Sequence, residues 1–294
     1  MENSLDYYVL DVFTSRRLTG NPLAVFFPPE PLTTEEMLAI AREMNLSETT
    51  FVSRRAPEIE AAEGVRVRIF TTQEELPFAG HPTLGPAWLL HQQRGGERVV
   101  LDLRVGQIPV EFTERDGQLM GEMRQRDPEL GAVHAAEEVA RAVGVPLADV
   151  DPSLPIQTVS TGRAFTMVPL RSLEASGRLQ VDARGAMEFA QTHGGKFFYF
   201  VTREVVTAGA TLHARMQFYN GEDPATGSAA GCCTAWAVRH GVLASEARGL
   251  IEQGLEIARP SFLHIRARRT VDGVTDVRVG GGVVETARGE YLLP

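Results

Sequence analysis

The feature that constrains this chain most is an internal repeat. A shift of 147 residues, without gaps, aligns a block in the first half of the 294-residue sequence with a block in the second half. The aligned pairs are Arg68 with Arg215, Glu75 with Glu222, Pro77 with Pro224, Gly80 with Gly227, and His81 with Ser228. In each block a β-prone segment precedes an acidic loop with a proline, and a glycine then leads into an apolar helix. This repeat predicts two similar lobes whose equivalent loops face one cleft.

The length and composition suit a globular protein of two such lobes. With 294 residues and 43% hydrophobic content, the chain can form a stable core without disulfides or a structural metal. We expect an N-terminal lobe over residues 1–122, completed by a C-terminal strand within 275–294, and a C-terminal lobe over 123–294. The connection between the two is expected within residues 121–131, where Pro128 stands.

Charge and hydropathy argue against several classes of partner. The net charge is −9, from 38 acidic and 29 basic residues, and like charges do not gather in one block. This balance disfavours a nucleic-acid or anionic membrane surface. Because no apolar run approaches the length of a membrane span and residues 1–10 lack the pattern of a secretory signal, we expect a cytoplasmic protein outside the membrane.

Metal and cofactor motifs are missing from the sequence. The seven histidines form neither an HExxH motif nor a cluster with cysteines at zinc-ligand spacing. The two cysteines, Cys232 and Cys233, are adjacent, which suits neither a disulfide between them nor a zinc site. Lys196 is the sole lysine, so Schiff-base chemistry would depend on that one residue. We therefore expect no metal.

Two glycine-containing loops are the candidate binding segments. Gly80 and His81 start one apolar helix, and Thr226, Gly227 and Ser228 start the other. The first turn of a helix carries free N–H groups and the positive end of the dipole, which favour an anion. Either loop alone is explained as an ordinary helix start. Two matched loops in equivalent places favour binding of a carboxylate.

Three further polar residues have both a structural and a functional interpretation. Glu48 lies at the junction of a predicted helix that ends near Met44 and a predicted strand over 47–53, where burial would raise the pKa of a carboxyl toward the range useful for acid–base catalysis. From composition alone the simpler interpretation is a solvated glutamate at a strand entry or a capping partner. Asp223 precedes a proline and could be a turn or cap residue. Asn21 could be a turn residue or a ligand contact.

Four segments together resemble the PhzF-like family of phenazine-biosynthesis proteins, which share the diaminopimelate epimerase fold. The segments are DVF at 11–13 with TGNPLAV at 19–25, NLSETTFV at 45–52, ELPFAGHPT at 75–83 and GEDPATGSA at 221–229. Each segment is short, but four in the expected order make the resemblance specific.

The resemblance implies an α+β fold of two pseudo-symmetric lobes, each a curled, mostly antiparallel, barrel-like sheet around a central helix, in a protein that is usually a homodimer. It also implies a cofactor-independent isomerase that moves a proton within a small carboxylated metabolite, with Glu48 as the general acid/base. On this basis we expect Glu48, His81 and Asp223 to take part in the reaction. The residues expected to bind the substrate are Asn21, Gly80, Thr226, Gly227 and Ser228.

Two other functions stay open at this point. One is an epimerase or racemase that uses Glu48 and Asp223 on opposite faces of its substrate. The other is a metabolite-binding protein without activity on the same scaffold. Amino-acid epimerases of this fold use two cysteines, one from each lobe, whereas Cys232 and Cys233 both lie beyond the second glycine loop. A racemase with two thiols is therefore disfavoured.

Overall fold

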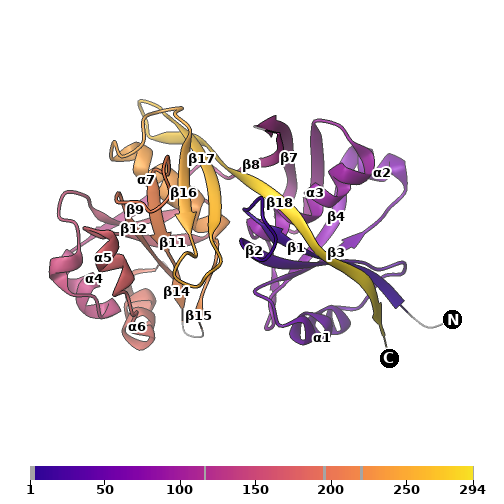
Figure 1. The fold of residues 1–294 in the computed structure, drawn as a ribbon, viewed down its shortest axis with the longest axis horizontal. Coiled ribbons are helices and arrows are strands. Elements are labelled where there is room, and N and C mark those ends of the chain that lie inside the picture. The colour runs from indigo at the N-terminus through magenta and orange to yellow at the C-terminus, as the bar shows by residue number, and fades with distance from the viewer. Residues whose placement is uncertain (1–3, 116, 195–196, 219–220, 294) are drawn as a thin grey trace. The chain divides into compact units, whose positions relative to one another are not determined.

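The chain divides into two compact units in the computed structural model (Figure 1), which describes residues 4–115, 117–194, 197–218 and 221–293. Unit 1 comprises Met1–Arg124 and Gly280–Pro294, and unit 2 comprises Gln125–Val279. Lys196, on which the argument about Schiff-base chemistry depends, lies outside the described residues. Within those residues, none of the helices has the length and apolar character needed to span a bilayer.

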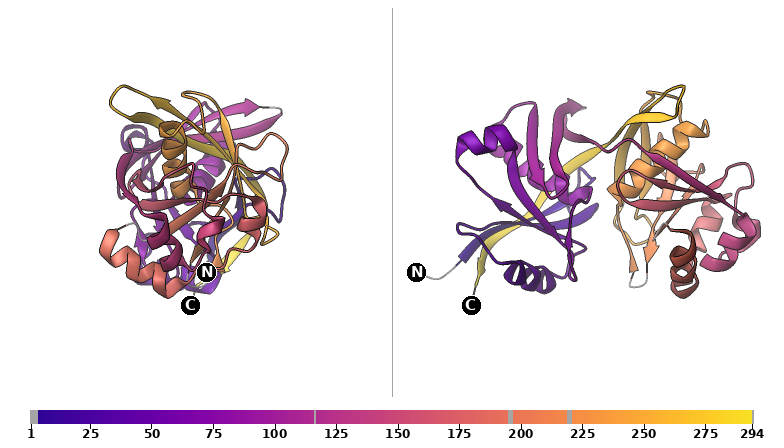
Figure 2. Two further views of the ribbon diagram at one scale, coloured as in Figure 1. Left: turned by 90° about the vertical axis from the view of Figure 1, so that its left-hand side faces the viewer. Right: turned by 180° about the vertical axis from the view of Figure 1, so that it is seen from behind.

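Unit 1 is a closed barrel of eight strands. Around the ring they are β1 (Ser4–Val12), β2 (Asn21–Phe27), β3 (Thr49–Ser53), β4 (Val65–Phe70), β6 (Arg98–Leu103), β7 (Gly106–Arg115), β8 (Gln118–Arg124) and the C-terminal part of β18 (Val274–Leu292). The ring closes because β18 pairs antiparallel with β1, from Ser4 opposite Leu292 to Val12 opposite Val283. The long yellow strand β18 can be followed in Figures 1 and 2.

A helix, α3 (His81–Arg94), packs inside this barrel against β1, β2, β3, β6 and β8. The short strand β5 (Glu75–Leu76) pairs with β4 and leads into it. Gly85 lets α3 approach the sheet, because a Cβ atom there would collide with the side chain of Leu23. Two further helices of unit 1 are α1 (Thr34–Met44) and α2 (Pro57–Glu63). Helix α1 begins with a capping box between Thr33 and Glu36.

Unit 2 is built on a sheet of the same kind. In spatial order its strands are the first part of β18, then β17 (Ser261–Arg269), β16 (Gly249–Gln253), β13 (Leu212–Arg215), β12 (Phe197–Thr202), β11 (Ala164–Pro169), β10 (Ile156–Ser160) and β9 (Glu129–His134). Helix α7 (Gly227–Arg239) is almost fully buried against β10, β11 and β17. The other described elements of unit 2 are α4 (Ala136–Val143), the 3₁₀ turn η1 (Leu147–Asp149), α5 (Leu173–Gly177), α6 (Ala183–His193) and the antiparallel pair of β14 (Gln217–Phe218) and β15 (Gly221–Glu222).

The two units share one pattern of strand pairing. In unit 1 the pairs β1–β2, β3–β4 and β6–β7 are antiparallel, whereas β2–β3 and β4–β6 are parallel. In unit 2 the pairs β10–β11, β12–β13 and β16–β17 are antiparallel, whereas β11–β12 and β13–β16 are parallel. This match confirms the predicted α+β fold of two pseudo-symmetric lobes, each a mostly antiparallel sheet with a buried central helix.

Two strands occupy most of the segment that the sequence indicated as a connection. Residues 121–124 end β8, residues 129–131 begin β9, and the connection itself is limited to residues 125–128. Gly121 and the charged residues around it have low strand propensity, which hid β8. In the barrel this glycine is required, because a Cβ atom there would collide with Leu84 of α3. The C-terminal strand expected within 275–294 is β18, which runs from Val274 to Leu292.

The repeat is visible in matched ion pairs. Arg68 of β4 donates two hydrogen bonds to Glu75, at 2.8 and 2.7 Å, and Arg215 of β13 donates two to Glu222, at 2.8 and 2.6 Å. In both units the glutamate stands five residues before the glycine at the start of the central helix. Each ion pair therefore ties the loop that leads into that helix to the neighbouring strand.

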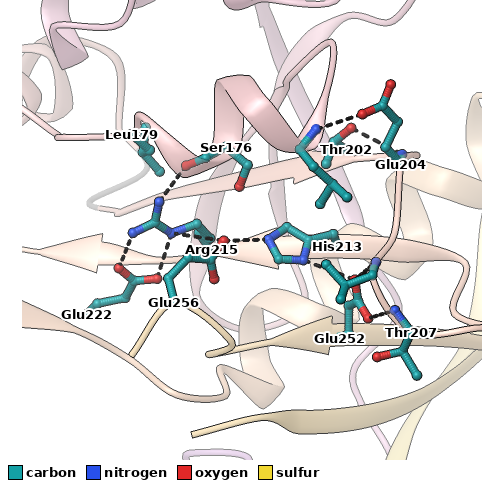
Figure 3. A network of polar contacts seen from close by, with 12 residues as sticks. Ser176, Leu179, Thr202, Glu204, Thr207, His213, Arg215, Glu222, Glu252 and Glu256 are labelled. Atoms are coloured by element: carbon teal, nitrogen blue, oxygen red, sulfur yellow. Dashed lines mark hydrogen bonds and ion pairs between the residues drawn. The ribbon is translucent and has the colours of Figure 1, made fainter. Parts of the chain in front are cut away.

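A second matched pair differs in chemistry between the units. Arg66 of β4 lies opposite Asp102 of β6 and donates to it at 3.3 Å. The equivalent positions hold His213 and Glu252, whose side chains approach to 3.1 Å. The second ring nitrogen of His213 lies 2.8 Å from Glu256 (Figure 3).

The two glutamates keep a charge on the buried imidazole of His213. Burial alone would lower the pKa of His213, but the hydrogen bonds and charges of Glu256 and Glu252 outweigh it and raise that pKa above its usual value. The carboxylate of Glu252 also accepts hydrogen bonds from the backbone N–H groups of Val206 and Thr207, at 2.6 and 2.8 Å. His213 and Glu252 therefore link two strands and a loop of unit 2, and the raised pKa favours the charged form of the imidazole.

The raised pKa of His213 predicts how stability changes with pH. The stabilisation is complete below the ordinary histidine pKa of about 6.5 and is lost as pH rises through the higher pKa of the folded state. His213→Arg keeps the charge at every pH. From pH 6 to pH 9 the free energy of unfolding should therefore fall more in the wild type than in His213→Arg.

Urea denaturation at the two pH values measures this difference. The reciprocal variant Arg66→His serves as the matched test in unit 1 and should acquire a smaller pH dependence of the same sign. Equal pH dependence in the wild type and in His213→Arg would show that His213 is not charged in the folded protein.

Candidate functional site

Glu48 lies in the short connection between α1 and β3. The helix ends at Met44, Asn45 turns the chain in the left-handed conformation with φ of 50°, and β3 begins at Thr49. The Glu48 side chain is 17% exposed, so it is largely shielded from water but reachable. The sequence therefore placed this carboxylate correctly at the junction of a helix and a strand.

His81 is the first residue of α3, and its imidazole is buried beside Asn21. The Asn21 amide Nδ2 lies 3.3 Å from His81 Nδ1 and donates to it, because an amide nitrogen cannot accept. The hydrogen of the neutral ring is then on Nε2. Burial lowers the pKa of His81 to about 3, so the imidazole is neutral near pH 7.

The Nε2 atom of His81 lies near the carboxylate of Glu48 but does not form a hydrogen bond with it. Nε2 lies 3.4 Å from Glu48 Oε2, but among the described residues Nε2 has no hydrogen-bond partner. Because the imidazole is neutral, the contact is not an ion pair. A buried donor without a partner is costly, so this atom suits an acceptor on a ligand or a closer approach of Glu48.

The start of α3 adds further donors beside His81. Gly80 precedes the helix and offers no side chain to cap it, in contrast to Thr33 at the start of α1. Pro82 has no N–H, and the Thr83 N–H donates to the Gly80 carbonyl at 3.1 Å. The N–H groups of Gly80 and His81 are therefore the ones that can reach an anion at the positive end of the helix dipole. This end of α3 is therefore suited to an anion.

In unit 2 the predicted residues gather at the start of α7. The Thr226 hydroxyl donates to Asp223 Oδ2 at 2.6 Å, so it is engaged with that carboxylate instead of capping the helix. Gly227 is the first helical residue, and Ser228 follows it with a half-buried side chain. The first-turn N–H groups of α7 are thus left for an anion, as in α3.

The two helix starts differ by one position. The repeat aligns Gly80 with Gly227, yet Gly80 lies just before α3 whereas Gly227 is already inside α7. The structure brings together Asn21, Glu48, Gly80 and His81 in unit 1, and Asp223, Thr226, Gly227 and Ser228 in unit 2. That the two groups serve one substrate stays a prediction.

Three buried residues around the start of α7 escaped the sequence reasoning. Gln125 Nε2 donates to the carbonyl of Gly227 at 2.8 Å. Gln253 bonds to both Asp223 and Thr226, and Tyr199 bonds to Gln253. Isolated glutamines form no recognisable motif, so only their buried positions in the fold reveal them.

The two thiols are unsuited to act as catalytic bases, and the described residues do not form a metal site. Burial raises the pKa of Cys232 to about 11 and raises the pKa of Cys233 further, so both stay protonated inside α7 and cannot serve as bases near pH 7. In residues 4–115, 117–194, 197–218 and 221–293, no three His, Cys, Asp or Glu side chains gather in a way that could hold a metal ion.

Comparisons with known proteins agree with this architecture. The family model for phenazine biosynthesis-like proteins, PhzC-PhzF, matches residues 10–289. Trans-2,3-dihydro-3-hydroxyanthranilate isomerase of Pseudomonas aeruginosa is 36% identical over 293 residues, covering 98% of this chain and 99% of the relative.

Solved structures give the same result. A PhzF-family phenazine biosynthesis protein of Bacillus anthracis has a TM-score of 0.88 at 24% identity, covering 99% of both chains. A predicted epimerase of Pseudomonas aeruginosa has a TM-score of 0.83 at 35% identity, covering 99% of this chain and 100% of the other. With the pairing pattern, the repeat and these likenesses over nearly the whole length, the chain belongs to the PhzF-like family of phenazine biosynthesis-like proteins and is an isomerase.

Proposed function

We propose that this isomerase moves a proton between two carbons of a small cyclic carboxylate, with Glu48 as the acid/base that carries the proton. The observation that supports this most strongly is the pairing of a shielded Glu48 with a neutral, buried His81 whose Nε2–H has no hydrogen-bond partner among the described residues. The Pseudomonas aeruginosa relative is named for trans-2,3-dihydro-3-hydroxyanthranilate. We take this compound, or a close analogue of it, as the substrate.

The proposed reaction conserves atoms and electrons. The ionised Glu48 removes a proton from a carbon that is conjugated with the substrate carboxylate, and the electron pair of the broken C–H bond enters the conjugated system. The protonated Glu48 then returns the same proton to a different carbon, and the double bonds shift. No oxidant or reductant is required, which is why we expect no cofactor.

The remaining residues have binding roles in this proposal. The first-turn N–H groups of α3 and α7 hold the substrate carboxylate and stabilise the negative charge that spreads onto it in the transition state. His81 Nε2–H donates to the substrate or to Glu48, and Asn21 fixes its tautomer. Asp223 and Ser228 bind the polar groups of the substrate. The homodimer and the cytoplasmic location stay predictions.

An epimerase is the second candidate, because one similar structure is described as a predicted epimerase and two carboxylates, Glu48 and Asp223, are available. A single base acting on one face favours isomerisation, since it returns the proton to the face that it left. Inversion of a carbon needs a second base on the opposite face.

Replacement of Glu48 tests the acid/base assignment. Glu48→Gln cannot accept a proton, so kcat with trans-2,3-dihydro-3-hydroxyanthranilate should fall at least ~100-fold. The far-ultraviolet circular dichroism and the melting temperature should change little. The matched control is Glu43→Gln, on the exposed side of α1, which should keep full turnover. Substantial activity in Glu48→Gln would remove Glu48 from the mechanism.

Heavy water separates the two reactions. Turnover in D₂O, followed by proton NMR of the product, should show a shifted double bond and at most one deuterium at the carbon that receives the proton. An epimerase would instead give a product with the same bonds, an inverted centre and deuterium at that centre. The second result would transfer the catalytic role to Glu48 and Asp223 together.

A further inference from the structure

Gln253 is fully buried at the end of β16, behind the start of α7. Gly254 follows it with φ of 77°, and a Cβ atom at that position would stand 2.6 Å from the carbonyl oxygen of Pro224. The end of β16 is therefore packed directly against the turn that carries Asp223. A side chain at position 253 can reach this turn without any movement of the backbone.

All four hydrogen-bonding positions of the Gln253 amide are occupied. Its Oε1 accepts from the Tyr199 hydroxyl at 2.8 Å and from the Thr226 N–H at 3.1 Å. Its Nε2 donates to the Asp223 carbonyl at 2.8 Å and to Thr226 Oγ1 at 3.1 Å. The Thr226 N–H can only donate and the Asp223 carbonyl can only accept, so the amide fits in one orientation.

These bonds fix the direction of the next one. Because Thr226 Oγ1 accepts from Gln253, its single hydrogen is left to donate. The carboxylate oxygen Asp223 Oδ2, 2.6 Å away, is a much stronger acceptor than the Met216 sulfur at 3.1 Å. Burial raises the pKa of Tyr199 well above its usual value, so the Tyr199 hydroxyl keeps its hydrogen and donates. The chain of donors therefore runs from Tyr199 and Gln253 through Thr226 to the Asp223 carboxylate.

We propose that Gln253 is a positioning residue of the isomerase, which sets the first turn of α7 and aims the Thr226 hydroxyl at the Asp223 carboxylate. The inference rests on the proposed function, because Asp223 and the first turn of α7 matter for turnover only if they hold the substrate. Gln253 itself acts through Thr226 and Asp223 and touches no substrate.

Gln253→Glu converts this role into a pH-dependent one. When protonated, the introduced carboxyl keeps the acceptor and one donor, whereas the ionised carboxylate has no donor and draws the Thr226 hydroxyl away from Asp223. With trans-2,3-dihydro-3-hydroxyanthranilate, kcat should be near the wild-type value at pH 5. It should fall about 10–100-fold as pH rises to 8, with the wild-type profile as reference. Thr226→Val should lose a similar factor at every pH, and the double variant should lose no more than Thr226→Val.

The matched control is Gln157→Glu. Gln157 is also a buried glutamine of unit 2, but it bonds to Gly131 and to His240 at the other end of α7. Replacement of Gln157 by Glu should change the stability of the protein, but kcat should depend on pH as it does in the wild type. Circular dichroism at each pH establishes that all variants are folded.

Hydrogen exchange gives a measurement that needs no substrate. The backbone N–H groups of residues 223 and 225–230 should exchange about tenfold faster in Gln253→Glu at pH 8 than in the wild type or in Gln157→Glu. Unchanged exchange there would overturn the inference. So would a wild-type pH profile in Gln253→Glu together with a dead Glu48→Gln variant. Full turnover in Glu48→Gln would overturn the proposed function instead, and the exchange result would still decide the role of Gln253.

Discussion

The structure depends on two helices whose first turns are buried without a side-chain cap of the usual kind. A buried N–H group must find a partner, and the first N–H groups of a helix have none within the helix. At α1 the protein solves this with Thr33 and Glu36, and at α6 with Asp182. At α3 and α7, which are enclosed by their sheets, the capping position holds Gly80 or a threonine engaged elsewhere. A bound carboxylate is the partner that suits such a helix start.

The loops that enter these helices are held by charge pairs that both units share. Arg68 with Glu75, and Arg215 with Glu222, each join a strand to the loop five residues before the helix start. Buried ion pairs add little net stability, since desolvation offsets most of their attraction. Their value here is geometric, because a bidentate arginine defines the position and the angle of the carboxylate that it binds. The same device in both units keeps two equivalent helix starts in equivalent places.

How much the sequence reveals varies with the physical source of each feature. Local signals located the end of α1 at Met44, where the structure has it. The repeat located both helix starts to within one residue. The sequence did not reveal strand β8, because Gly121 is needed to leave room for Leu84 of α3. No local sequence pattern records such a contact between distant residues. Gln253 escaped for the same reason, since its four hydrogen bonds reach separate segments of unit 2.

Anion binding at the uncapped starts of α3 and α7 is tested most directly by amide NMR during a titration with anthranilate, a stable carboxylate. The N–H signals of Gly80 and His81, and those of Gly227 and Ser228, should shift as anthranilate is added, whereas the N–H signals at the capped start of α1 should not. Signals at both uncapped starts that stay still while other amides respond would contradict this binding.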